Sequence, residues 1–392
     1  MSQQKQIYLD NAATTPLYPE ALDAMMPYLT SEYGNPSAVY GFARNARKAV
    51  ENAREEVAKS LNADPSEIVF TSSGTEANNW AISELMQKGG HIITSIAEHH
   101  AVGHVCESLK RQGKNIEVTY LPVDDKGFVC PQNLKSAIRS NTVLISIMWA
   151  NNEIGTIQPI AELSAIAKEN GVLFHTDAVQ AVGHIPIDLA LMSNVDILTM
   201  SAHKFGGPKG VGALYIRKGT KLHPMIYGGA QEKNRRAGTE NVTGIVGMGK
   251  ALTISINKLS EEYNRVSNLR DMLIKQIEDA IPKVKLNGAI GKDRLPGNVN
   301  FSFDYIEGES LLLLLDMNGF CASSGSACSS ASLEPSHVLL ALGMSHEQAH
   351  GSIRFSLGDT STEEDINMLT EVLPKLVKQL RDMSPLSEGV EF

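Results

Sequence analysis

The chain has 392 residues, of which 42% are hydrophobic and 20% are charged, as in an ordinary globular protein with room for a large core. A formal net charge of −9 argues against nucleic acid or an anionic membrane surface as the main partner. The sequence contains no apolar run near the roughly 20 residues that span a bilayer, and its first six residues are polar, so we expect a cytoplasmic protein.

The chain has only four cysteines, Cys106, Cys130, Cys321 and Cys328, and no two of them form a C-x-x-C pair. Four cysteines are too few for a disulfide framework in a chain of this length. The absence of a C-x-x-C pair disfavours a zinc site built by the protein alone. We interpret Cys106 and Cys130 as structural and Cys321 as half-buried.

The first part of the chain predicts a short loop-like segment at 8–16, which could pack on either domain, and an amphipathic helix at 40–61. From residue 65 to residue 216, short β-rich runs alternate with helical stretches such as 159–170. This alternation predicts an α/β fold with a mainly parallel, seven-stranded sheet covered on both faces. The seven runs are 68–71, 91–94, 116–121, 142–148, 172–175, 195–200 and 213–216.

The second part predicts one or two long helices at 245–281, followed by a small α+β domain. Its expected elements are strands at 299–303 and 353–356, a helix around 311–316 and a helix from 362 to about 383. We therefore expect a large domain at 15–258 and a small domain formed by 1–14 together with 259–392.

Lys204 is the most informative residue, because it follows the apolar run 195–200 and precedes a glycine-rich turn. Burying an ammonium group is costly, so a lysine in such a place usually loses its proton or its charge. Binding an aldehyde covalently is a common use of such a lysine. The alternative is a surface loop in which Lys204 is solvated, which the preceding apolar run makes less favourable.

Two other polar motifs also follow predicted strands, where ligands collect in parallel sheets. Gly74 and Thr75 begin a helix whose free backbone N–H groups could bind a phosphate. Taken alone, a plain helix cap with Glu76 explains that motif better. Asp177 could pair with a protonated ring nitrogen of a cofactor, or simply cap the next helix.

Asn152 could donate to a phenolic oxygen of a cofactor, although a polar turn is the simpler interpretation of an isolated asparagine. His99 could stack on a planar ring and move protons, although a lone histidine is usually an ordinary one. Cys328 lies in a small, polar, glycine-containing stretch, where a thiol can act as a nucleophile. Arg354 lies in a predicted strand and could bind a carboxylate or form a structural ion pair.

Together these motifs resemble the cysteine desulfurases of the IscS/NifS branch, which belong to the class V aminotransferases with the pyridoxal phosphate (PLP) fold of type I. The resemblance covers nearly the whole chain. Any one motif is modest evidence, but the ordered set is highly specific. The motifs lie at residues 8–16, 33–37, 151–155, 201–210, 236–241, 324–328 and 353–356.

The resemblance implies roles for the residues that would hold the cofactor. Lys204 resembles the lysine that binds the PLP aldehyde, Asp177 the partner of the pyridine nitrogen, and His99 the residue stacked on the ring. The other implied contacts are Asn152 and Gln180 near the phenolic oxygen, and Gly74, Thr75, Ser201 and His203 at the phosphate.

It also implies the partners of the reaction. Thr239 resembles a phosphate contact from a second subunit, which implies a homodimer. Asn11, Asn152 and Arg354 lie where the family holds the substrate L-cysteine, with Arg354 on its carboxylate. Cys328 resembles the residue that accepts sulfur as a persulfide. No metal ligand is certain, and Cys328 is a candidate transient ligand of an iron–sulfur cluster.

The implied reaction begins when L-cysteine displaces Lys204, whose uncharged amine then removes the α-proton while His99 could add or remove protons. Cys328 attacks the substrate sulfur, alanine leaves, and the sulfur passes to an acceptor. We expect an iron–sulfur scaffold protein, with a nitrogenase-specific scaffold or a tRNA thiolation relay left open. The alternatives are a selenocysteine lyase, an aminotransferase, or an inactive protein that binds the cofactor.

Overall fold

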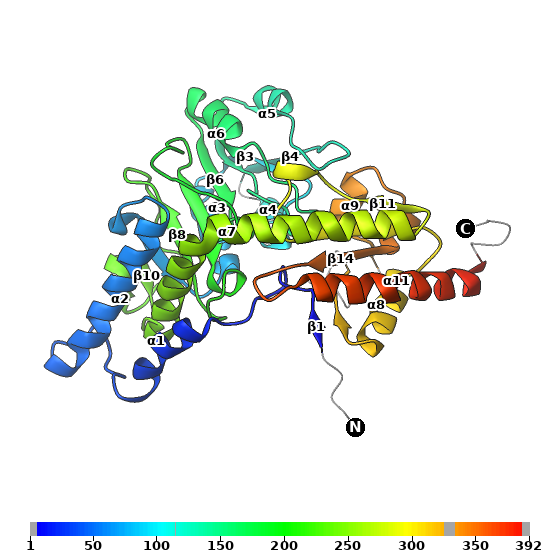
Figure 1. Ribbon diagram of the computed structural model, residues 1–392. Coiled ribbons are helices and arrows are strands. Elements are labelled where there is room, and N and C mark those ends of the chain that lie inside the picture. The colour runs from blue at the N-terminus through cyan, green and yellow to red at the C-terminus, as the bar shows by residue number, and fades with distance from the viewer. Residues whose placement is uncertain (1–5, 114, 325–333, 386–392) are drawn as a thin grey trace.

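The computed structural model describes residues 6–113, 115–324 and 334–385, which form a large α/β body and a smaller α+β body (Figure 1). The large body is built on a seven-stranded sheet in the order β2-β8-β7-β6-β5-β3-β4. Only β8 runs opposite to the other six strands, so the predicted, mainly parallel sheet is confirmed. The strands are β2 (Ile68–Thr71), β3 (Gly90–Ser95), β4 (Ile116–Leu121), β5 (Thr142–Ser146), β6 (Leu173–Asp177), β7 (Ile197–Ser201) and β8 (Gly212–Ile216).

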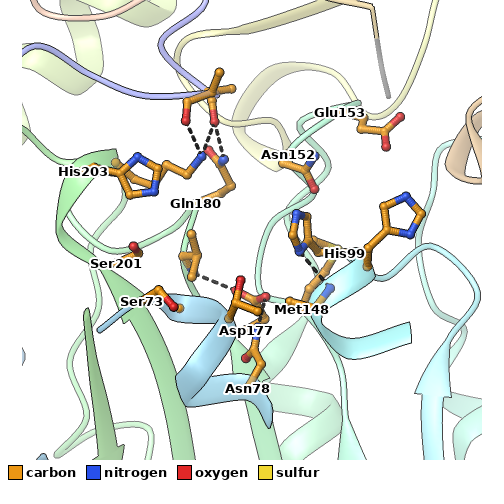
Figure 2. A pocket seen from close by; sticks show the side chains of 18 of the residues that line it. Ser73, Asn78, His99, Met148, Asn152, Glu153, Asp177, Gln180, Ser201 and His203 are labelled. Atoms are coloured by element: carbon orange, nitrogen blue, oxygen red, sulfur yellow. Dashed lines mark hydrogen bonds between the residues drawn. The ribbon is translucent and has the colours of Figure 1, made fainter. Parts of the chain in front are cut away.

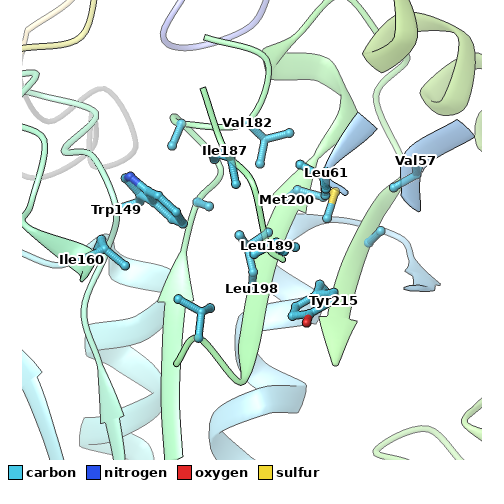
Figure 3. Close-up of a cluster of buried hydrophobic side chains, with 14 of the residues drawn as sticks. Val57, Leu61, Trp149, Ile160, Val182, Ile187, Leu189, Leu198, Met200 and Tyr215 are labelled. Atoms are coloured by element: carbon cyan, nitrogen blue, oxygen red, sulfur yellow. The ribbon is translucent and has the colours of Figure 1, made fainter. Parts of the chain in front are cut away.

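Helices cover both faces of this sheet. Because successive strand residues point to opposite faces, one strand contributes side chains to two different cores. In β7, Ile197 packs in the cluster that contains Trp80 of α3, whereas Leu198 belongs to the core that contains Val57 and Leu61. Figure 3 shows the latter core. The helices of the large body are α1 (Pro19–Thr30), α2 (Gly41–Ser60), α3 (Gly74–Leu85), α4 (His100–Arg111), α5 (Pro131–Ala137) and α6 (Ile160–Glu169).

The small body has its own core around the three-stranded antiparallel sheet β11-β12-β14. Two helices, α8 and α11, pack against each other beside it. Its elements are β11 (Val284–Leu286), β12 (Asn298–Phe303), β13 (Phe320–Cys321), β14 (Ser352–Ser356), α8 (Gly308–Met317), α9 (His337–Ala341), α10 (His346–His350) and α11 (Glu363–Met383).

One continuous helix, α7 (Val242–Ala280), links the two bodies. It packs on α1 and α2 at one end and on α11 at the other, as Figure 1 shows. Accordingly, Leu252 belongs to the core of the large body and Leu273 to that of the small body. The sequence predicted either one long helix or two in this region, and the structure has one.

The N-terminal segment also touches both bodies. Its strand β1 (Ile7–Tyr8) pairs in parallel with β13, and the backbone N–H of Thr15 donates to His203 O next to β7. A further small hairpin, β9 (Ala230–Gln231) with β10 (Arg236–Ala237), precedes α7. No helix among the described residues is long and apolar enough to cross a membrane.

Candidate active site

A cavity of about 350 Å³ lies where the ends of β2, β6 and β7 meet the N-terminal segment and β14 (Figure 2). Because β2 is antiparallel to β8 and β8 is antiparallel to β7, the carboxyl ends of β2 and β7 share one edge of the sheet. The cavity brings together ten residues that the sequence singled out: Gly74, Thr75, His99, Asn152, Asp177, Gln180, Ser201, His203, Lys204 and Arg354.

Lys204 follows β7 in a short 3-10 turn, Ala202–Lys204, and lines the cavity together with Asp177 and Gly74. Its Nζ donates to the backbone carbonyls of Ala12 and Ala13, both at 2.7 Å. The amine therefore lies inside the site and not in bulk water, held by the N-terminal segment.

Asp177 is the last residue of β6 and is only 4% exposed. Its Oδ2 accepts from Asn78 Nδ2 at 2.6 Å, and its Oδ1 accepts from the backbone N–H of Val179 at 3.0 Å. The second bond holds a turn, since the described residues between β6 and β7 form turns and not the helix that the sequence had offered for Asp177 to cap. The carboxylate remains in the cavity wall. Asn78 escaped the sequence analysis, although its i+4 spacing from Gly74 places both on one face of α3.

The start of α3 forms another part of the cavity wall. Ser73 caps the helix, since its Oγ accepts from the N–H of Glu76 at 3.1 Å. The first-turn N–H groups at Gly74 and Thr75 have no partner within the helix, and such groups bind anions. A Cβ at Gly74 would lie 2.7 Å from Val179 Cγ2, so this approach requires glycine.

His203 lies near this anion site, and burial lowers its pKa to about 4, which keeps the ring neutral at physiological pH. One of its ring nitrogens, Nδ1, lies 3.2 Å from Thr14 Oγ1. Figure 2 shows His203 on one side of the cavity and His99 with Asn152 on the other.

His99 is the cap of α4, and its Nδ1 accepts from the N–H of Ala101 at 3.1 Å. Burial lowers the pKa of His99. The neutral ring therefore carries its proton on Nε2, a tautomer assigned from this hydrogen bond. In this state His99 Nε2 is a hydrogen-bond donor.

Arg354 enters the cavity from β14 and is only 2% exposed. Its Nη2 forms an ion pair with Asp10 Oδ1 at 2.8 Å, and its Nη1 donates to Asn152 O at 3.0 Å. Its Nε is buried and has no hydrogen-bond partner among the described residues. The structural ion pair that the sequence had offered for Arg354 is therefore present, and carboxylate binding by Arg354 stays a prediction.

Asn11 was expected beside the substrate and does not line this cavity. Asn11 Nδ2 donates to Ser356 O at 2.9 Å, and the residue lines two neighbouring pockets instead. Thr239 lines a separate pocket beside Thr71 and Arg236. Cys328 lies outside the described residues.

The residues present fit PLP. Asp177 stands where a pyridine nitrogen needs an anion, Lys204 where an aldehyde needs an amine, and the start of α3 where a phosphate needs N–H donors.

The comparisons with known proteins agree with this geometry. The family model of class V aminotransferases matches residues 7–369. A protein named cysteine desulfurase IscS from Clostridium botulinum is 56% identical over 391 residues, covering 98% of this chain and 97% of that protein.

Two solved structures are also similar. A NifS-like protein has a TM-score of 0.89 at 38% identity, covering 96% of this chain and all of that one. A structure described as SspA in complex with cysteine has a TM-score of 0.79 at 37% identity, covering 89% of this chain and 98% of that one. The chain belongs to the class V aminotransferase family and, within it, to the IscS/NifS branch of cysteine desulfurases.

Proposed function

We propose that this chain is a PLP-dependent cysteine desulfurase, which converts L-cysteine to L-alanine and places the sulfur on Cys328 as a persulfide. One observation carries the proposal: a single cavity contains an amine, a carboxylate, an anion site and a guanidinium in the places that this chemistry needs. The IscS relative and the solved structure described with cysteine support the choice of substrate.

When bound through Lys204, PLP supplies an aldehyde that captures the amino group of an amino acid and a ring that withdraws electrons from its α-carbon. Asp177 keeps a proton on the ring nitrogen, and Asn78 orients Asp177 through its 2.6 Å hydrogen bond. Once displaced, Lys204 Nζ is the base for the α-proton. In that state the carbonyls of Ala12 and Ala13 can hold the amine in place.

Arg354 would bind the substrate carboxylate, using the buried Nε that has no partner among the described residues. The remaining assignments keep their expected roles: Gly74, Thr75, Ser201 and His203 at the phosphate, Asn152 and Gln180 near the phenolic oxygen, His99 on the ring, and Asn11 beside the substrate.

A homodimer would bring Thr239 to the phosphate of the partner's site. A set of large apolar side chains is exposed around residues 33–42, with Val39 97% exposed and Tyr33 74% exposed. Such exposed apolar patches mark interaction sites. The short Ser37–Gln231 hydrogen bond joins this patch to the segment that carries Thr239. Light scattering after size exclusion should give a dimer for the wild type and a monomer for Val39→Asp, with Leu191→Asp as the control, because Leu191 is also highly exposed, at 82%.

Further assignments are also proposals. We divide the chain into 15–258 and 1–14 with 259–392, which is supported by the two separate cores. We place the protein in the cytoplasm, because the described cysteines, Cys106, Cys130 and Cys321, are free thiols. An iron–sulfur scaffold protein is the proposed sulfur acceptor.

The deciding experiment incubates the purified holoenzyme with L-cysteine and a reductant and measures sulfide and alanine. We expect equal amounts of both. Lys204→Ala should abolish the visible absorption band of the bound cofactor, whereas Cys328→Ser should keep the band and lose sulfide release. Unchanged sulfide release by Cys328→Ser would instead indicate a lyase that needs no persulfide.

A further inference from the structure

Glu153 is a buried carboxyl in the cavity wall to which the mechanism above gives no task. It lies in the turn 151–155 and is only 5% exposed. Its backbone N–H donates to Asn151 Oδ1 at 2.8 Å, and its backbone carbonyl accepts from Asn298 Nδ2 and Asn300 Nδ2 at 3.1 and 3.0 Å. The side chain is therefore attached to a backbone that both bodies of the molecule hold in place.

The two carboxyl oxygens of Glu153 differ in their surroundings. Oε2 shares a short hydrogen bond with Ser336 Oγ, which also accepts from the N–H of Leu339 at the start of α9. The Ser336 bond is the only hydrogen bond of this carboxyl group among the described residues, so Oε1 has no partner there. One oxygen is thus fixed by Ser336, and the other has no hydrogen-bond partner at the edge of the cavity that Glu153 helps to line.

The charges around Glu153 leave it without a counter-ion of its own. Arg354 is the cation whose charge acts on Glu153, but it already pairs with Asp10 and forms no ion pair with Glu153 among the described residues. The other titratable groups that line the cavity are Asp177, His203 and Lys204 together with His99 and His100 at the start of α4 and His337 from α9. Burial lowers the pKa of His99 and that of His100, so neither of these rings supplies a positive charge near neutral pH.

Burial raises the pKa of Glu153 to about 7, against the opposing effects of Ser336 and Arg354. An isolated carboxylate in a buried site is unfavourable unless a cation compensates it. A substrate carboxylate at Arg354 would add a further negative charge to the same cavity wall and raise this cost.

We propose that Glu153 takes up a proton from solvent when the carboxylate of the amino acid substrate binds at Arg354, so that Glu153 sets the pH dependence of substrate affinity. This inference rests on the proposed function, because it requires an amino acid in the cavity. The step forms one O–H bond on Glu153, with the proton taken from water or buffer, and involves no oxidation or reduction.

Calorimetry of the holoenzyme with L-alanine tests this proposal. L-Alanine is chosen because it has the substrate's carboxylate and no thiol. Titrations at about pH 7.5 in two buffers of different ionisation enthalpy count the protons taken up. We expect the wild type to take up a larger fraction of a proton than Glu153→Gln. Above about pH 7, wild-type affinity should fall towards the limit of roughly tenfold per pH unit, whereas the Glu153→Gln affinity should depend less on pH.

Ser336→Ala is the second variant, and it retains the carboxyl. Because the Ser336 hydrogen bond lowers the pKa of Glu153, its removal should move the pH dependence of alanine affinity to higher pH. Equal proton uptake by the wild type and Glu153→Gln would overturn the proposal. Should Glu153→Gln fail to fold, an unchanged pH dependence in Ser336→Ala would overturn it instead. Proton-linked alanine binding in a protein that releases no sulfide would refute only the desulfurase function.

Discussion

At the scale of single residues, Asp177 owes its orientation to a neighbour on another element. Asn78 of α3 donates to Asp177 Oδ2 at 2.6 Å, and both side chains are buried. A hydrogen bond to a charged, buried group contributes more than one between neutral groups, because the charge has little other solvation.

Asn78→Ala should therefore weaken cofactor binding and slow turnover while leaving the fold intact. A lost charge-assisted bond costs about 1.5–3 kcal/mol, or roughly ten- to hundredfold in affinity. Fluorescence titration of the apoprotein with PLP measures this loss of affinity. Asn79→Ala, the next residue, is the control, because Asn79 bonds only to the carbonyl of Thr75 in its own helix. Equal affinities for the two variants would show that Asn78 has no such role.

His175, two residues before Asp177 in β6, should make the fold sensitive to acid. It is fully buried between Ser146 and Thr199, and burial lowers its pKa to about 3 from 6.5. Between these two values the unfolded chain binds a proton that the native protein does not, so stability rises with pH over this range. The free energy of unfolding should therefore decrease as the pH falls below about 6.5.

Denaturant unfolding of the wild type and His175→Gln at about pH 7.5 and about pH 5.5 measures this effect. The loss of stability on acidification should be smaller in the variant, because glutamine does not titrate. The exposed His346→Gln provides the control and should behave like the wild type. A variant that loses as much stability as the wild type would exclude His175 as the acid-sensitive group.

At the scale of elements, the tight contact between the start of α3 and the residues after β6 shapes the anion site. A Cβ added at Gly74 would lie 2.7 Å from Val179 Cγ2, closer than real Cβ contacts allow. Gly74→Ala should therefore displace the helix start and weaken PLP binding, since overpacking costs about 1–3 kcal/mol.

The double variant Gly74→Ala/Val179→Ala tests this directly, because it removes the methyl group that the new Cβ would meet. We expect it to recover much of the PLP affinity, while Val179→Ala alone stays near the wild type. Fluorescence titration with PLP again provides the measurement. If the double variant binds as poorly as Gly74→Ala, the loss comes from a cause other than this contact.

The elements themselves could largely be predicted from the sequence, because hydrophobic periodicity is a local signal. The predicted run 68–71 coincides with β2, and the predicted 172–175 differs from β6 mainly because that strand continues to Asp177. Pairs that depend on tertiary structure could not be predicted. Arg354 and Asp10 are 344 residues apart, and Glu153 and Ser336 are 183 apart, so no spacing in the chain indicates either contact.

At the scale of the whole molecule, the site works only if the two bodies keep their relative position, since Lys204 follows a strand of one and Arg354 lies in a strand of the other. A cluster of three side chains, Tyr18, Lys258 and Asp359, joins the two bodies. Asp359, five residues after Arg354, accepts from Tyr18 Oη at 2.6 Å and from Lys258 Nζ at 2.5 Å. Tyr18 in turn donates its backbone N–H to Gly206 O, two residues after Lys204.

Asp359→Ala should therefore raise the KM for L-cysteine more than it lowers kcat, because it loosens Arg354 relative to Lys204 without touching the reacting atoms. Both ionic side chains are about one third exposed, so the ion pair itself is worth no more than about 1 kcal/mol, or roughly fivefold in KM. Steady-state sulfide release measures both constants. Glu371→Ala, which breaks the exposed Glu371–Lys375 pair on α11, is the matched control and should leave KM unchanged. A lower melting temperature with an unchanged KM would mean that the cluster stabilises the fold without setting the distance between the two binding groups.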